Sequence, residues 1–121
     1  MSKDSISIEL TTITCVNTSE PGSDEVYIKY SSDGGIEKRF PSASYHSMSP
    51  GDTWSPNLPI TFSESAVVAL YDNDKGNDDF LGSYTYYPSD PQPETVPVTN
   101  TNGASYKLST TPAPATAPPA T

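Results

Sequence analysis

Proline restricts the secondary structure of this chain more than any other residue. Thirteen prolines are spread along its 121 residues, and each removes a backbone N–H donor and disfavours an interior position of an α-helix. Seven glycines and many serines and threonines interrupt the segments between them. Little room is left for long helices, so the sequence favours short strands joined by turns.

The apolar residues follow the alternation that is typical of strands. The segment from Ile6 to Cys15 alternates between apolar and polar residues, but the phase of the alternation reverses halfway. This reversal predicts a β-bulge near Thr11 and Thr12, where one extra residue shifts the pattern. Further strands are predicted at residues 26–30, 36–40, 60–62, 66–71, 80–87, 96–98 and 106–108, with residues 45–48 as an optional short strand.

About eight short strands, with frequent turns and no helical periodicity, predict an all-β fold, an eight-stranded antiparallel β-sandwich. The length corresponds to one domain, which we place at residues 1–109. Residues 110–121, TTPAPATAPPAT, contain no bulky apolar side chain. They are predicted to form a solvated Pro/Thr/Ala-rich tail of polyproline character.

An acidic cluster follows the apolar segment 66–71. The stretch LYDNDKGNDDFLG, from Leu70 to Gly82, contains four aspartates: Asp72, Asp74, Asp78 and Asp79. Two unit negative charges about 4 to 5 Å apart repel by roughly 3 to 4 kcal/mol at an effective dielectric of about 20. The cluster therefore calls for a cation, and many hard oxygens on a flexible loop favour Ca²⁺ over the smaller, strictly octahedral Mg²⁺.

A second acidic turn precedes another predicted strand. It runs from Glu20 to Glu25, immediately before the alternating segment that begins at Val26. Backbone carbonyls are free at strand ends, so loops there commonly hold ligands. If both acidic loops lie at the same end of the sandwich, Asp24 can complete the ion shell.

Two motifs together resemble a C2 domain, the eight-stranded calcium-binding β-sandwich. GSDEVYIKY, Gly22 to Tyr30, resembles the first-loop Ser-Asp-Pro-Tyr segment of that family, with Glu25 in place of the proline. LYDNDKGNDDFLG resembles its third loop, Asp-x-Asp followed by Asp-Phe-Leu-Gly. The resemblance covers residues 6 to 108.

The resemblance implies four aspartates as calcium ligands: Asp24, Asp72, Asp74 and Asp79. It also implies a supplementary ligand, either Asp78 or a backbone carbonyl near Asn73 and Lys75. An earlier first-loop aspartate of the family has no direct counterpart here, and Glu20 or Asn17 is left to replace it. An EF-hand loop starting at Asp72 is excluded, because Asn77 stands where its glycine belongs and Ser83 where its glutamate belongs.

The net charge of the chain limits the classes of partner that it can bind. Six Lys and Arg against fifteen Asp and Glu give a formal net charge of −9, which excludes a basic nucleic-acid surface. The chain also lacks a lysine cluster to attract anionic lipid, so bound cations would have to bridge it to an acidic membrane. The loop tips 18–23 and 75–77 are polar and lack the apolar residues that members of the C2 family insert between lipids.

Catalytic chemistry is not expected. Cys15 is the only cysteine, which excludes an intrachain disulfide and a cysteine-based zinc site. His46 is the only histidine, and no nucleophile motif accompanies it. We expect a non-enzymatic protein.

We therefore expect a calcium-binding C2-like module that binds an acidic phospholipid or protein surface in the presence of calcium. The alternative is a surface or filament protein whose copies assemble as a homo-oligomer through calcium and the tail. MSKDSISIEL has neither the basic region nor the apolar block of a signal peptide, and no apolar run approaches twenty residues. We expect a soluble chain, and an extracellular or cell-surface location stays open.

Overall fold

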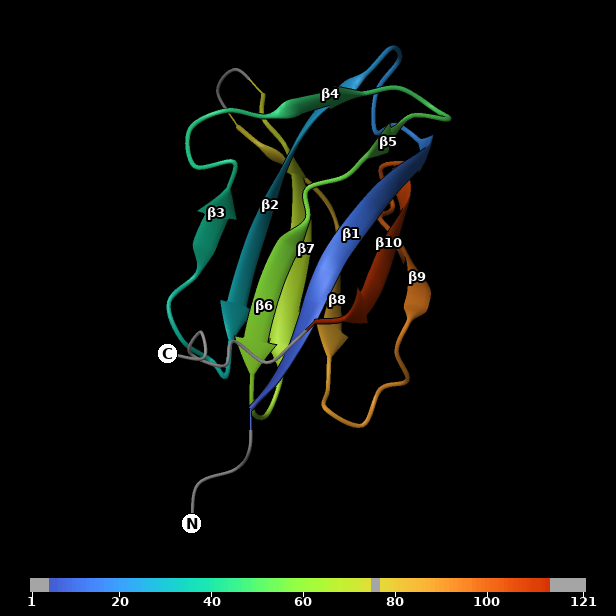
Figure 1. The fold of residues 1–121 in the computed structure, drawn as a ribbon. Coiled ribbons are helices and arrows are strands. Elements are labelled where there is room, and N and C mark those ends of the chain that lie inside the picture. The colour runs from blue at the N-terminus through green and yellow to red at the C-terminus, as the bar shows by residue number, and fades with distance from the viewer. Residues whose placement is uncertain (1–4, 75–76, 114–121) are drawn as a thin grey trace.

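The computed structural model describes residues 5–74 and 77–113, which form two facing antiparallel sheets without a helix (Figure 1). The first sheet contains, in spatial order, β5 (Thr53–Trp54), β1 (Ile6–Asn17), β10 (Ser105–Pro112) and β9 (Glu94–Thr99), with β6 (Leu58–Phe62) also paired to β1. The second sheet contains β3 (Lys38–Phe40), β2 (Asp24–Ser32), β7 (Ala66–Asp72) and β8 (Asp79–Tyr86), with β4 (His46–Met48) also paired to β2. The predicted all-β antiparallel sandwich is confirmed.

The described part of the chain contains ten strands, where about eight were expected. The addition includes β5, a two-residue strand that pairs with β1 through Ile13 and Trp54. The predicted bulge in β1 is confirmed, because its register with β10 shifts between Leu10 and Thr12.

The core lies between the two sheets and follows from the alternation. On β1, Leu10 and Ile13 are both completely buried, because the bulge between them changes which residues face inward. On β7, Val68 and Leu70 face the core, and the tyrosine Tyr106 on β10 closes it near the end that carries the acidic loops. Burial of these side chains holds the sheets in register.

Strand β10 continues through Pro112, into the segment that the sequence assigned to the tail. Thr110 is only 1% exposed and pairs with Leu10 on one side and Glu94 on the other. Residues 114–121 of the predicted tail lie outside the described residues. Among the described residues, no helix has the length and apolar character needed to cross a membrane.

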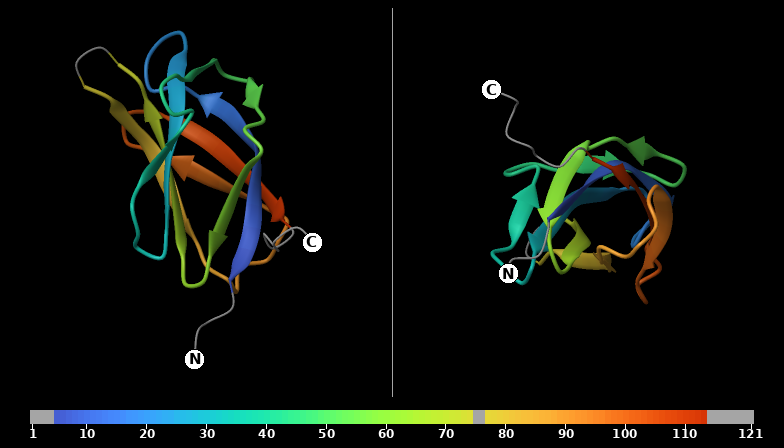
Figure 2. Two further views of the ribbon diagram at one scale, coloured as in Figure 1. Left: turned by 60° about the vertical axis from the view of Figure 1, so that its left-hand side comes forward. Right: turned by 60° about the horizontal axis from the view of Figure 1, so that its bottom comes forward.

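The acidic loops occupy one end of the sandwich, called here the acidic pole. The connection between β1 and β2 lies beside the ends of β7 and β8, as Figures 1 and 2 both show. The backbone joins them directly, because Asn73 N donates to Glu25 O over 2.7 Å. The condition under which the sequence brings the two acidic loops together, that both lie at the same end of the sandwich, is therefore met.

Candidate metal centre

Strand pairing brings the acidic residues of the two loops together. Asp72 is the last residue of β7 and pairs with Val26 of β2 on one side and Asp79 of β8 on the other. The ladder therefore places the end of the first loop and both ends of the second around Asp72. Carboxylates 48 residues apart, those of Asp24 and Asp72, reach the same pole by this route.

Five carboxylates form two groups that share Asp72. Within each group, the carboxylate oxygens lie within 4.8 Å of one another. The first group contains Glu20, Glu25 and Asp72, and the second contains Asp72, Asp74 and Asp79. Of the predicted ligands, Glu20, Asp72, Asp74 and Asp79 are thus brought together.

Asp72 is the centre of this arrangement and is completely buried. Its Oδ1 atom accepts a hydrogen bond from the Glu25 amide over 2.7 Å, while its Oδ2 atom has no hydrogen-bond partner among the described residues. Burial raises the pKa of Asp72 to about 8; the Glu25 amide opposes this rise, and the carboxylates of Asp24 and Glu20 add to it. A buried oxygen without a donor is the position at which a cation would be most stabilising.

Asp24 has a different environment from that predicted. It is fully buried, and its oxygens accept hydrogen bonds from Tyr106 Oη over 2.6 Å, Ser19 Oγ over 2.8 Å and Ser19 N over 3.0 Å. These donors tie the β1–β2 loop to β10. Asp24 lies outside both carboxylate groups, and its role as a calcium ligand stays a prediction.

Asp78 also lies outside both groups. It is exposed, and its carboxylate accepts hydrogen bonds from the Tyr27 hydroxyl and, over 3.0 Å, from Asp74 N. These donors, that of Tyr27 above all, lower the pKa of Asp78. Its assignment as a supplementary ligand stays a prediction.

Glu25 is the member of the groups that sequence reasoning missed. It stands where the C2-family motif has proline, so the resemblance assigns its side chain no role as a ligand. Burial, and repulsion from Glu20, Asp24 and Asp74, raise its pKa, as expected for a carboxylate among others. The acidic turn itself was a usable signal, because Glu25 is one of its carboxylates and lies at the start of β2.

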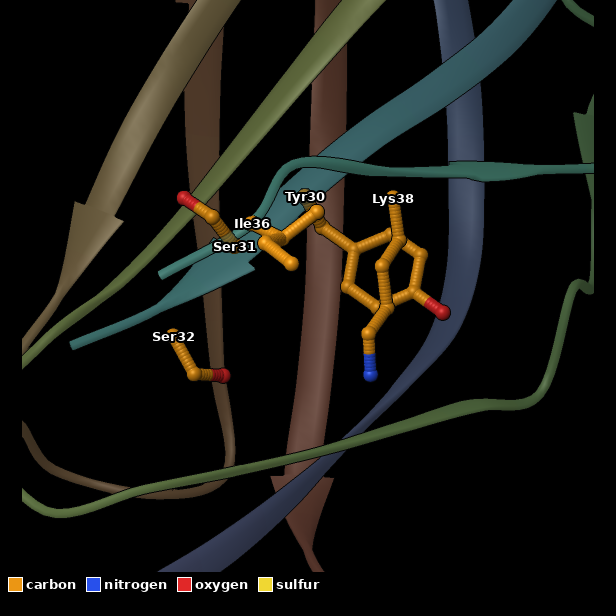
Figure 3. A pocket seen from close by; sticks show the side chains of 5 residues that line it. All are labelled: Tyr30, Ser31, Ser32, Ile36 and Lys38. Carbon is orange, nitrogen blue, oxygen red and sulfur yellow. The ribbon is translucent and has the colours of Figure 1, made fainter. Parts of the chain in front are cut away.

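The described residues also form a pocket away from the acidic pole. This pocket of about 300 Å³ lies where β2 ends and the chain turns towards β3 (Figure 3). Its lining is mostly hydroxyl-bearing, with one cation and one exposed apolar side chain: Tyr30, Ser31, Ser32, Ile36 and Lys38. None of these residues belongs to either carboxylate group.

The only histidine, His46, belongs neither to the carboxylate groups nor to the lining of this pocket. Its ring stacks on Trp54 with 5.1 Å between the ring centroids and 5° between the planes. Phe40 stacks on the same indole at 6.2 Å. These rings connect the edge of one sheet to the edge of the other, because Trp54 belongs to β5 and the other two to β3 and β4.

Solved structures with a similar fold include C2 domains. A C2 domain of plant extended synaptotagmin 1 superposes with a TM-score of 0.58 at 14% identity, over 94% of this chain and 99% of that one. Another C2 domain gives a TM-score of 0.53 at 11% identity, over 91% and 98%. No protein-family model matches the chain, and no curated protein matches its sequence.

A third similar structure is larger than this chain. It belongs to CC2D1B, a protein described as coordinating ESRCT-III activity during the mitotic reformation of the nuclear envelope. The TM-score is 0.58 at 7% identity, over 91% of this chain and 54% of that one. At these identities the likeness establishes the fold, and the predicted C2-like β-sandwich is confirmed.

Proposed function

We propose that this chain is a non-enzymatic calcium-binding module of C2-like fold, whose acidic pole attaches to a partner surface when calcium is bound. The observation that carries the proposal is the buried Asp72 carboxylate, which belongs to both acidic groups and has one oxygen without a donor among the described residues. An uncompensated buried charge is strongly destabilising. A cation held between the groups would remove that cost.

The ligand atoms favour calcium over other ions. Both groups consist of carboxylates alone, so the site offers hard oxygens and neither the thiolate nor the imidazole that zinc or copper prefers. Calcium accepts six to eight oxygens in flexible geometry, which suits side chains from two loops. Glu20, Glu25 and Asp72 would hold one ion, and Asp74 and Asp79 would join Asp72 around a second.

The side on which the carboxylate groups are accessible to solvent indicates which kind of partner can bind. Asp74 and Asp79 are accessible to solvent, while Asp72 closes the inner side of the site. An ion there would keep coordination positions on its outer side, which oxygens of a phosphate or carboxylate on another surface can fill. The net charge of −9 repels an acidic surface, so attachment to acidic phospholipid or to an acidic protein would depend on the ion.

Calcium binding is tested first on the protein alone. Titration calorimetry of chelator-treated protein should give binding heat, and calcium at about one hundred times its Kd should add about 2.7 kcal/mol to the free energy of unfolding. The Asp72→Asn variant should lose both effects, because both groups contain Asp72. Asp90→Asn is the matched control: Asp90 accepts a hydrogen bond from Tyr87 N in the β8–β9 loop, away from both groups. Equal calcium binding by wild type and Asp72→Asn would refute the proposal.

The nature of the partner requires a second measurement. Calcium is added to the protein alone while light scattering is followed, and then in the presence of vesicles of phosphatidylserine or of phosphatidylcholine, which are pelleted. We expect calcium-dependent pelleting with phosphatidylserine only. Scattering that rises without vesicles would instead support calcium-dependent self-assembly, and a protein that stays in the supernatant throughout would leave an acidic protein as the partner.

A further inference from the structure

The Asp78 carboxylate is bound to the sheet rather than directed at the acidic groups. One of its oxygens accepts the Tyr27 hydroxyl, and the other accepts Asp74 N over 3.0 Å. Tyr27 belongs to β2, and Asp78 immediately precedes β8. This carboxylate therefore connects a sheet residue to the backbone of a residue whose own side chain is in the second group.

Tyr27 is held firmly enough to serve as a fixed anchor. It is 1% exposed although it lies on the outward face of its strand. The Arg39 guanidinium lies 3.8 Å from the centroid of its ring, and the Tyr71 ring stacks on it at 5.7 Å with 18° between the planes. These contacts come from β3 and β7, the strands on either side of β2, so the position of the hydroxyl is set by the sheet.

This connection involves the two solvent-accessible members of the second acidic group, Asp74 and Asp79. Asp74 receives the hydrogen bond through its backbone, and Asp79 follows Asp78 in the chain. Both carboxylates must stay within 4.8 Å of Asp72 to share an ion with it, although they repel one another. Holding them there before the ion arrives lowers the entropy cost of binding.

We propose that Tyr27 and Asp78 are a positioning pair, which holds Asp74 and Asp79 beside Asp72 so that calcium binds tightly. Asp78 then acts on the ion through the backbone of Asp74 and is not a ligand. This inference rests on the proposed calcium site and names two residues that determine its affinity.

The pair is tested by calcium titration of Tyr27→Phe, which removes one hydroxyl and keeps the ring. We expect calcium affinity about ten-fold weaker than in wild type, the cost of one hydrogen bond to a charged acceptor. The matched control is Tyr30→Phe, because Tyr30 lies on the same strand but faces the pocket of Figure 3. Its affinity should equal that of wild type, and all three proteins should melt within a few degrees of one another in chelator.

A double-mutant cycle separates positioning from direct ligation. If the two residues act as one unit, Tyr27→Phe should change nothing further in an Asp78→Ala background. Full additivity, or a Tyr27→Phe affinity equal to that of wild type, would overturn the positioning pair while leaving the calcium site intact. Absence of binding by wild type would overturn the calcium site itself, so the two failures are distinguishable.

Discussion

The two oxygens of Asp72 have different surroundings, and this asymmetry gives the residue its role. One oxygen accepts a backbone amide, which favours the charged form, while the other is buried among carboxylates without a donor from the described residues. Without metal, the group avoids the cost of a buried charge by keeping its proton, which is why its pKa rises to about 8. Proton and calcium therefore compete for the same carboxylate.

This competition predicts how stability depends on pH. The folded pKa of Asp72 is raised from 3.8 to about 8, so between these values the folded state holds a proton that the unfolded state has lost. In chelator, the contribution of Asp72 to stability should therefore decrease as pH rises towards about 8, and the gain in melting temperature on adding calcium should increase over the same range.

Melting curves at several pH values, with chelator and with excess calcium, measure both trends. Asp72→Asn should show no calcium effect at any pH, because it lacks the carboxylate that both groups share. Asp90→Asn should keep the wild-type behaviour. A calcium effect that is constant from about pH 6 to pH 8 would contradict this account of Asp72.

The spacing of residues around Asp24 in the sequence does not reveal which groups donate hydrogen bonds to its carboxylate. The sequence placed it in an acidic turn that ends before Val26, whereas the structure makes it the first residue of β2. Its oxygens are nevertheless hydrogen-bonded to Tyr106, 82 residues away, and to Ser19. Such donors arise only from the pairing of distant strands, so the sequence identified an acidic residue at the pole without identifying its contacts.

Among the strands, β8 depends most directly on one small residue. Gly82 has a φ of +134°, and a Cβ atom added there would lie 3.0 Å from Thr99 N and 3.1 Å from Thr99 O. Both atoms are backbone atoms of β9, at the edge of the other sheet, and they cannot move as a flexible side chain can. The absence of a side chain at Gly82 thus lets the two sheets approach at this edge.

We expect Gly82→Ala to lower the free energy of unfolding by about 2 to 4 kcal/mol, from backbone strain and steric overlap together. Gly34→Ala is the matched control: Gly34 has a φ of +71° and nothing within 4 Å of the added Cβ. It should cost only about 1 kcal/mol, from the backbone conformation alone. Urea unfolding measures both, and equal losses would show that contact with β9 contributes nothing.

The alternation of apolar and polar residues predicted the strands that have one apolar, buried face. It predicted less well where the buried residues are polar. It located the bulge in β1, since the apolar phase changes there. It ended the last strand early, because the buried residue Thr110 carries no apolar signal. The side chain of Thr110 instead donates to Gln92 over 2.7 Å, and its backbone pairs with strands on both sides.

For the molecule as a whole, the sequence predicted the fold and the two acidic loops at strand ends, but not the grouping of the acids. Whether the two loops share one end was left open by the sequence, and the structure brings their carboxylates together. Which oxygens converge depends on register and on side-chain hydrogen bonds, so Glu25 entered a group unexpectedly while Asp24 and Asp78 bind protein donors. The exclusion of a basic nucleic-acid surface, by contrast, follows from the net charge of the sequence alone.

The pairing of β1 with β10 also governs how the molecule can be tethered. Ile8 lies opposite Pro112, so the first strand starts and the last strand finishes side by side, far from the acidic pole (Figure 1). A group attached at the start of β1 or at the end of β10 would therefore lie at this remote base. A fluorescent reporter or a solid support coupled there would leave the acidic pole free to meet a partner surface.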